Sequence, residues 1–316
     1  MKQFISVKDV RQPSELMKLA KMLKKQPFAH RHYGQNKTLG LLFFNPSLRT
    51  RMSTQKAALN LGMDVMVMNF NSDSWTIELA NGTVMDQGTQ EHIKEAAAVI
   101  SQYCDIIGVR TFAGLKDVED DYGETILKKF IEYASVPVIS LESATLHPLQ
   151  SLADWLTIDE HKAHSRPKVV LTWAPHPRAL PQAVANSFVQ WMQVADVDLT
   201  ITFPTGMDLS PDFTKGCKVT NNQEEAFQNA DFVYAKNWSS YSNYGQKATG
   251  HEDWIVTQYK MALTNNGKFM HCLPVRRNVV VSDDVLDKPM SIVIEQANNR
   301  TYAAQAVLLK MLGYEG

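Results

Sequence analysis

Short apolar, β-branched runs recur along the chain, and segments of a different periodicity separate them. The runs lie at residues 39–44, 64–69, 105–110, 136–140, 168–173, 198–203, 231–235 and 268–273. Between them, EHIKEAAAVISQY, GETILKKFIEYA and PQAVANSFVQWM carry apolar residues at i, i+3 and i+4, which predicts amphipathic helices. This alternation predicts an α/β fold with parallel sheets flanked by helices, one sheet in each half.

The break between the halves is expected near residues 145–165, after the fourth strand. A chain of 316 residues fits two domains, each able to bury its own core. We predict one domain over residues 1–148 and a second over 149–297. A helix over about 149–161 would connect them. The last helix, about 300–312 within the C-terminal segment 298–316, could pack on either domain.

The overall charge favours no polyanionic partner. The formal net charge is -1 and charged residues make up 21% of the chain, so nucleic acid and membrane are not expected partners. No apolar run approaches ~18 residues, and the N-terminus has no leader-like pattern. The three cysteines, Cys104, Cys217 and Cys272, form no close pair, which predicts a reducing, cytoplasmic environment. An anionic ligand must therefore be held by a local site.

Common cofactor and metal motifs are missing from the sequence. It contains no Gly-x-Gly-x-x-Gly, no P-loop, no HExxH, no Cys-x-x-Cys and no Gly-x-Ser-x-Gly. We therefore expect no cofactor and no metal.

Polar and basic residues follow most of the predicted strands. In open parallel sheets, ligands bind beyond the carboxyl ends of the strands, so these residues are candidates for one site. They are the NPSLRTR segment at 45–51, Arg110, Glu142, His147, Gln150, His176, Lys236, Cys272 and Arg276. Each also has an ordinary structural explanation, because a loop histidine or a small buried cysteine is common in any protein. Their coincidence at the same end of several strands favours a binding site.

The SLRTR stretch predicts an anion at a helix start. Ser47 is a typical N-cap, and exposed arginines after it would be unremarkable. Cations at a helix N-terminus oppose the helix dipole, however, unless an anion sits there. Backbone N–H groups, the hydroxyls of Ser47 and Thr50, and Arg49 would together hold a phosphate with charge-assisted hydrogen bonds.

Three ordered motifs carry a family resemblance. SLRTR at 47–51, HPLQ at 147–150 and HCLP at 271–274 resemble the aspartate/ornithine carbamoyltransferase family over essentially the whole chain. FFNPSLRTR, GTVMDQGTQEHI and MALTNNGKFMHCLPVRRNV are similar to the branch that acts on N-acylated ornithine. The Ser-Met-Gly loop of the enzymes that use free ornithine is absent, and KNWSSYSNYG occupies that region.

The resemblance implies a carbamoyl-phosphate domain, an acyl-ornithine domain, a C-terminal helix that returns to the first domain, and a knotted chain path. It also implies a homotrimer with active sites at subunit boundaries. The implied carbamoyl-phosphate contacts are Ser47, Leu48, Arg49, Thr50, Trp75, Arg110, His147, Pro148, Leu149, Gln150, Cys272, Leu273 and Arg300. The implied acyl-ornithine contacts are Glu142, His176, Lys236, Leu273, Arg276 and, from a neighbouring subunit, Gln90.

The expected catalytic residues are four of these. Thr50, Arg110 and His147 would polarise the carbamoyl carbonyl, so that charge developing on its oxygen meets fixed donors. The δ-amine must lose a proton before attack, either with help from Cys272 or to the leaving phosphate.

The acyl group is predicted from two positions. Members similar to the acetylornithine type carry Glu at the position of Gln90 and Lys at that of Val280. A neutral Gln90 would not repel the extra carboxylate of a succinyl group, although succinyl-type members are expected to carry Pro there. We therefore expect N-succinylornithine as the acceptor. N-acetylornithine, free ornithine, putrescine and aspartate remain alternatives, and a non-catalytic two-lobed anion-binding protein is the alternative from another class.

Overall fold

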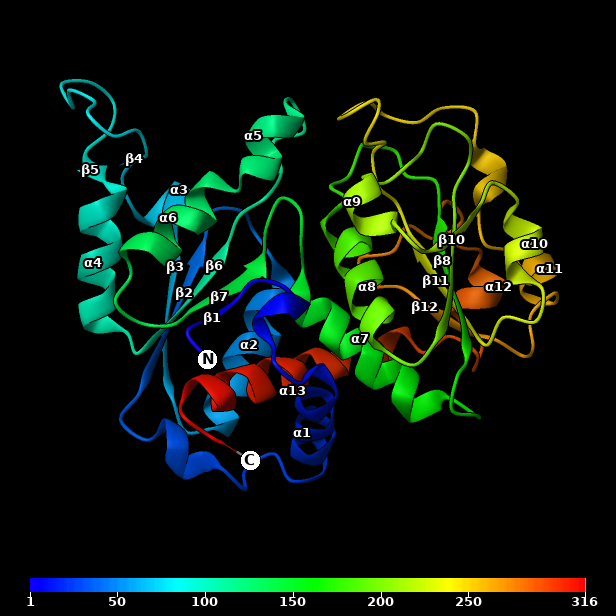
Figure 1. Ribbon diagram of the computed structural model, residues 1–316, viewed down its shortest axis with the longest axis horizontal. Coiled ribbons are helices and arrows are strands. Elements are labelled where there is room, and N and C mark those ends of the chain that lie inside the picture. The colour runs from blue at the N-terminus through cyan, green and yellow to red at the C-terminus, as the bar shows by residue number, and fades with distance from the viewer. Residues whose placement is uncertain (316) are drawn as a thin grey trace. The chain divides into compact units, whose positions relative to one another are not determined.

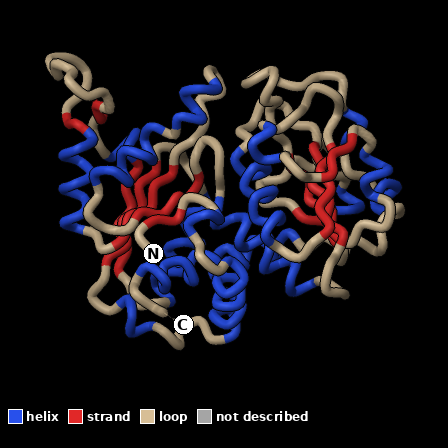
Figure 2. The backbone as a smooth tube through the Cα atoms, viewed as in Figure 1, coloured by secondary structure: helices blue, strands red, loops and turns tan. Residues whose placement is uncertain are grey.

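The computed structural model describes residues 1–315, and Gly316, the last residue of the predicted C-terminal segment, lies outside them. The chain divides into two compact units. Unit 1 comprises Met1–Ala113, Glu119–Leu149 and Arg300–Gly316, and unit 2 comprises Gly114–Val118 and Gln150–Asn299. A sheet of strands forms the centre of each unit, with helices around it (Figure 2). The predicted α/β fold with parallel sheets is confirmed.

The sheet of unit 1 has five parallel strands in the order β1-β7-β6-β2-β3. Their bounds are Gln3–Phe4 (β1), Thr38–Phe43 (β2), Asp64–Asn69 (β3), Ile106–Arg110 (β6) and Val138–Glu142 (β7). A small separate pair joins β4 (Ile77–Glu78) and β5 (Glu91–His92), and the loop between them projects from the unit (Figure 1).

Helices cover both faces of this sheet (Figure 1). The helices that lie wholly in unit 1 are α1 (Pro13–Lys25), α2 (Leu48–Asn60), α3 (Phe70–Asp73), α4 (Ile93–Tyr103) and α6 (Thr125–Tyr133), with 3-10 turns at Val7–Asp9 and Arg31–Gly34. Helix α5 (Val118–Gly123) begins in unit 2, and α13 (Val293–Met311) enters unit 1 at Arg300. Helices α4 and α6 bury Ile93 and Phe130 in one apolar core. Helix α2 is joined to α13 by a buried hydrogen bond from Asn60 Nδ2 to Gln305 Oε1, 3.1 Å.

Unit 2 repeats the arrangement with the strand order β10-β9-β8-β11-β12, again all parallel. The strands are Lys168–Trp173 (β8), Asp198–Thr202 (β9), Lys218–Thr220 (β10), Phe232–Lys236 (β11) and Lys268–Met270 (β12). Its helices are α7 (Pro148–His161, from Gln150 on), α8 (Ala183–Val194), α9 (Pro211–Thr214), α10 (Gln223–Phe227), α11 (Gln258–Met261) and α12 (Asp283–Leu286), with a 3-10 turn at Glu252–Trp254. Helix α8 lies on one side of the sheet, and α10, α11 and α12 lie on the other (Figure 1).

Three predicted boundaries were wrong. The strand expected at 136–140 is β7, which begins after Pro137 because proline has no N–H for the ladder, so Glu142 ends the strand rather than following it. The strand expected at 268–273 ends at Met270, because the Leu273 N–H donates to His271 Nδ1 instead of to a neighbouring strand. The last helix, expected at about 300–312, begins at Val293.

The strand orders locate a switch point in each sheet. In unit 1 the chain leaves β2 for β3 on one side and later returns to β6 on the other, so the order reverses between β2 and β6. In unit 2 it reverses between β8 and β11. Ligands of open α/β sheets bind beyond the carboxyl ends of the strands at such points. No helix within residues 1–315 is long and apolar enough to cross a membrane. The knotted chain path stays a prediction.

Candidate active site

The helix that follows β2 begins as the sequence predicts. Ser47 is the N-cap of α2, but its side chain makes no capping hydrogen bond, so the start of the helix does not use the hydroxyl. The first turn contains no acidic residue, and its backbone N–H groups have no intrahelical acceptor. Hydrogen bonds from Ser72 and Asn69 lower the pKa of Asp73, and the nearby charge of Arg51 lowers it further. The dipole of this helix start is therefore not offset by a first-turn carboxylate.

Arg110 lies at the switch point and organises the segment before α2. It ends β6, opposite Phe43 of β2 and, through a register shift, Glu142 of β7. Its Nη2 donates to Glu142 Oε2 at 2.7 Å, and its Nη1 donates to the carbonyls of Asn45 and Pro46, each at 3.0 Å. The side chain is only 8% exposed. A short, buried, charge-assisted bond of this kind fixes the guanidinium at the carboxyl edge of the sheet.

The turn after β7 brings His147 to the same edge. Glu124 holds that turn, because its Oε1 accepts from Ser143 Oγ at 2.6 Å and from Thr145 N at 2.8 Å. His147 then directly precedes α7, and its buried ring places Nε2 at 3.8 Å from Glu142 Oε2. Glu124 is therefore a supporting residue for a predicted catalytic histidine.

Arg300 joins two predicted site residues that are far apart in sequence. Its Nη2 donates to Thr50 Oγ1 at 2.6 Å and lies 3.4 Å from His147 Nε2. All three side chains are at least 93% buried. Thr50, Arg110, His147 and Arg300 thus meet in one buried cluster, in which Glu142 contacts Arg110 and His147 while Arg300 contacts Thr50 and His147. Such a cluster can bind a dianion and polarise a carbonyl oxygen.

A second basic cluster lies at the carboxyl edge of the sheet in unit 2. Lys236 ends β11 opposite Trp173, the last residue of β8, and His176 follows β8. Burial lowers the pKa of His176, and the charges of Lys236, Arg276 and Arg178 lower it further. A hydrogen bond with the Arg178 backbone raises the pKa, but the net shift is downward. These cations therefore lie near one another, which suits a ligand that carries carboxylates.

Comparison with known proteins gives the same assignment over the whole chain. Residues 2–160 match the model of the aspartate/ornithine carbamoyltransferase carbamoyl-P binding domain, and residues 181–311 match that of the Asp/Orn binding domain. The chain belongs to the aspartate/ornithine carbamoyltransferase family. The predicted resemblance is confirmed.

Individual relatives refine this family assignment. The N-succinylornithine carbamoyltransferase of Bacteroides thetaiotaomicron is 52% identical over 314 residues, which cover 99% of each chain. The N-acetylornithine carbamoyltransferase of Xanthomonas campestris is 39% identical over 88% of each chain. A crystal structure of acetylornithine transcarbamylase complexed with acetylcitrulline is 36% identical, with a TM-score of 0.94 over 99% of this chain and 100% of that one.

Gln150 of HPLQ and His271 of HCLP are connected within unit 2 of this carbamoyltransferase chain through residues that sequence reasoning missed. Gln150 Nε2 donates to Asp154 Oδ1 at 2.8 Å, and Gln296 Nε2 donates to the same oxygen at 2.7 Å. Gln296 Oε1 accepts from the N–H of His271, 2.9 Å. The LAD sequence after HPLQ gave no signal of this role, because a helical aspartate usually faces solvent.

Two predicted residues of unit 1 lie outside the buried cluster. Trp75 is 54% exposed, and its Nε1 donates to Glu91 Oε2 at 2.7 Å. Gln90 is exposed near β5, and its N–H donates to the carbonyl of Thr76 at 3.0 Å. The surface position of Gln90 fits the expectation that it acts in a neighbouring subunit.

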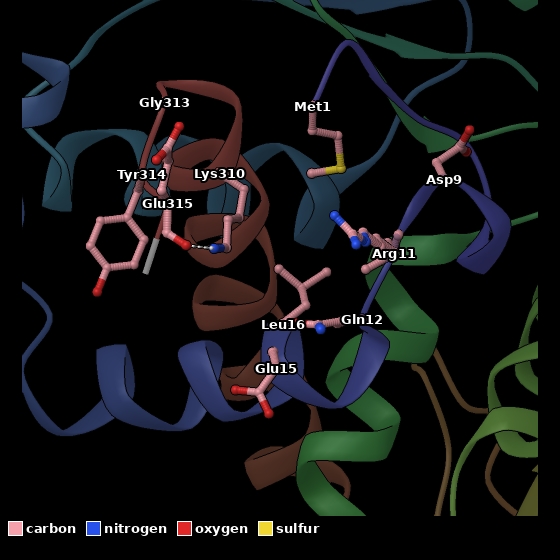
Figure 3. A pocket seen from close by; sticks show the side chains of 11 residues that line it. Met1, Asp9, Arg11, Gln12, Glu15, Leu16, Lys310, Gly313, Tyr314 and Glu315 are labelled. Atoms are coloured by element: carbon pink, nitrogen blue, oxygen red, sulfur yellow. Dashed lines mark hydrogen bonds between the residues drawn. The ribbon is translucent and has the colours of Figure 1, made fainter.

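A pocket of about 410 Å³ in unit 1 is lined by residues from both ends of the chain (Figure 3). Arg11, Glu15 and Lys310 line it, and Lys310 Nζ donates to the carbonyl of Glu315 at 3.1 Å. None of the predicted site residues lines this pocket.

Proposed function

We propose that this protein transfers the carbamoyl group of carbamoyl phosphate to the δ-amine of N-succinylornithine. The products are N-succinylcitrulline and phosphate, and the reaction serves arginine biosynthesis in the cytoplasm. The buried Thr50, Arg110, His147 and Arg300 cluster carries the proposal, because it joins anion-binding and carbonyl-polarising groups at the switch point of a parallel sheet. The 52% identical relative named for N-succinylornithine, against 39% for the N-acetylornithine enzyme, favours the succinyl acceptor.

In the proposed mechanism, unit 1 holds carbamoyl phosphate. The N-terminus of α2 with Ser47, Leu48, Arg49 and Thr50 receives the phosphate, assisted by Trp75. Arg110, His147 and Thr50 face the carbonyl oxygen, whose negative charge grows as the tetrahedral intermediate forms. Arg300 fixes Thr50 and His147 relative to each other.

The carbamoyl amide and the acceptor are assigned to the remaining residues. The HPLQ segment with Gln150, and the backbone carbonyls of Cys272 and Leu273, would orient the NH₂ group. The acyl-ornithine contacts are Glu142, His176, Lys236, Leu273 and Arg276, with Gln90 of a neighbouring copy. The cationic cluster around His176 suits a succinyl substrate, which carries two carboxylates.

The chemical step needs no covalent enzyme intermediate. The δ-amine first loses one proton, and its nitrogen then attacks the carbonyl carbon. The tetrahedral intermediate collapses as the carbon–oxygen bond to phosphate breaks, and phosphate takes the second proton from the new amide nitrogen. Cys272 is the candidate acceptor of the first proton. Positioning of two reactants in one site can supply much of the acceleration.

The test measures citrulline and phosphate formation with equal concentrations of N-succinylornithine, N-acetylornithine, ornithine, putrescine and aspartate. We expect the highest kcat/KM with N-succinylornithine. An Arg110→Met variant purified in the same way is the control for contaminating activity. Binding of carbamoyl phosphate without turnover of any acceptor would instead indicate the non-catalytic anion-binding protein.

We also propose that the protein assembles as a homotrimer. The outer side of α2 exposes Leu48 (67%), Met52 (63%) and Leu59 (55%), and the edge strand β3 exposes Met66 (55%), so unit 1 carries an apolar surface that a second copy could cover. Sedimentation should give three times the monomer mass of 35.6 kDa, and Met52→Glu should lower it.

Subunit complementation tests where Trp75 acts. Trp75→Ala and Arg110→Met variants should each have little activity, and mixing them should restore part of it if the two residues belong to one site on different subunits. Mixing Arg110→Met with Thr50→Val is the control, because both residues come from the same subunit. No recovery in the first mixture would place Trp75 outside the neighbouring site.

A further inference from the structure

Asp154 is a fully buried carboxylate in unit 2 that the proposed reaction does not use. It lies on α7, one turn after Gln150. Its Oδ1 accepts hydrogen bonds from Gln150 Nε2 and Gln296 Nε2. Since Oδ1 is the acceptor in both bonds, both amides turn their NH₂ groups toward Asp154. The carboxylate therefore decides the orientation of two buried side-chain amides.

The first bond determines which atom of Gln150 a ligand can meet. With Nε2 held by Asp154, the acceptor Oε1 remains, and this buried oxygen has no hydrogen-bond partner in the described structure. A buried acceptor without a partner costs about 1–3 kcal/mol. It therefore favours a ligand that supplies an N–H. In carbamoyl phosphate the only N–H donor is the carbamoyl NH₂.

The second bond reaches the loop after β12. Gln296 Oε1 accepts from His271 N, and His271 Nδ1 accepts from Leu273 N, both at 2.9 Å. Leu273 has a φ of 55°, a conformation that residues with a side chain rarely adopt. These hydrogen bonds support that conformation, so Asp154 acts through Gln296 on the loop that contains Cys272 and Leu273.

Tyr234 supports the same arrangement. Its ring is fully buried, and its hydroxyl interacts with both Asp154 and Cys272. Burial, followed by the negative charge of Asp154, raises the pKa of Tyr234 well above its usual value. The hydroxyl therefore stays protonated near the carboxylate.

We propose that Asp154 is a positioning residue that makes the site selective for a carbamoyl group over other acyl groups. It does so by leaving Gln150 Oε1 as the buried acceptor that meets the carbamoyl NH₂. This inference rests on the proposed carbamoyl-phosphate function. It adds a residue that need not touch the substrate.

The test compares the dissociation constants of carbamoyl phosphate and acetyl phosphate, in which a methyl group replaces the NH₂. In the natural protein carbamoyl phosphate should bind more tightly. In Asp154→Leu the ratio of the two constants should fall about tenfold, the size of one well-made hydrogen bond, with acetyl phosphate binding nearly unchanged. Asp154→Asn keeps an acceptor at the same place and should retain most of the selectivity.

Matched variants separate positioning from general structural damage. Thr157→Val removes a buried hydrogen bond from Asn299 Nδ2, 2.9 Å, on the same helix and should leave the ratio unchanged. If Asp154→Leu does not fold, Gln296→Met cuts the link to His271 while keeping the carboxylate, and it should lower the ratio in part.

The possible outcomes distinguish this inference from the function on which it rests. An unchanged ratio of the two dissociation constants in Asp154→Leu, with or without an equal loss of affinity for both acyl phosphates, would overturn the positioning role alone. A natural protein that binds no carbamoyl phosphate would overturn the proposed function and this inference together.

Discussion

The buried pair of Arg110 and Glu142 gives the sharpest prediction, because it combines a stability effect with a rate effect. Arg110→Met removes the 2.7 Å ion pair and both hydrogen bonds to the carbonyls of Asn45 and Pro46. Leaving one partner of a buried pair uncompensated costs about 3–5 kcal/mol of stability. His147 Nε2 lies 3.8 Å from the same carboxylate oxygen and stays beside it as a polar neighbour, so we expect the lower end, about 3 kcal/mol.

The double variant Arg110→Met/Glu142→Gln separates the two effects. It removes both charges, so the share of the loss caused by the uncompensated carboxylate should return, about 1 of the 3 kcal/mol. The two carbonyls still lack their donor, which keeps about 1 kcal/mol of the loss each. The rate should not return. Loss of one donor to a developing oxyanion costs about 10²–10³ in kcat, and neither variant contains the guanidinium.

Urea denaturation and steady-state formation of citrulline at saturating substrate measure the two quantities on the same preparations. A double variant no more stable than Arg110→Met would show that the uncompensated carboxylate is not the source of the instability. A raised KM for carbamoyl phosphate with unchanged kcat would make Arg110 a binding residue only.

Three further predictions test the rest of the site. Thr50→Val removes the hydroxyl that accepts from Arg300 at 2.6 Å. Hydrogen bonds to charged groups contribute about 1.5–3 kcal/mol, so calorimetry should show carbamoyl-phosphate binding weakened at least about tenfold. An unchanged affinity would exclude Thr50 from the carbamoyl-phosphate site. Gln90→Glu should shift the kcat/KM preference from succinyl toward acetyl substrate, and a constant ratio would mean that position 90 does not face the acyl group. Burial and nearby cations lower the pKa of His176 in the free protein, whereas the carboxylates of bound N-succinylornithine would raise it again. N-succinylornithine should therefore bind more tightly as the pH falls from the pKa of His176 in the complex to its lower pKa in the free protein. An affinity that does not change over this pH range would place His176 away from those carboxylates.

The local pattern was sufficient to predict most of the secondary structure. The runs at 64–69 and 168–173 are β3 and β8 with the same bounds, and α7 begins one residue before the predicted helix. Apolar periodicity reports burial on one side of an element, and turn residues mark its ends, so both signals are local. The three ordered motifs identified the family for a related reason, because each is a short segment that follows one strand or begins one helix.

Polar residues that are buried by distant parts of the chain defeated the same reasoning. The predicted start of the last helix was late because Gln296 and Asn299 suggest a loop, whereas each is buried and hydrogen-bonded. Glu124 and Asp154 gave no signal for the same reason. A carboxylate in a sequence is expected at the surface, and only its partners in space show otherwise.

The sequence by itself therefore determined the strands, the helices, the two parallel sheets and the family. The tertiary structure alone decided which polar groups face each other, such as Thr50 and Arg300, which are far apart along the chain. The physical reason is that hydrophobic periodicity is written in neighbouring residues. A buried hydrogen bond, in contrast, depends on where the fold brings two distant side chains.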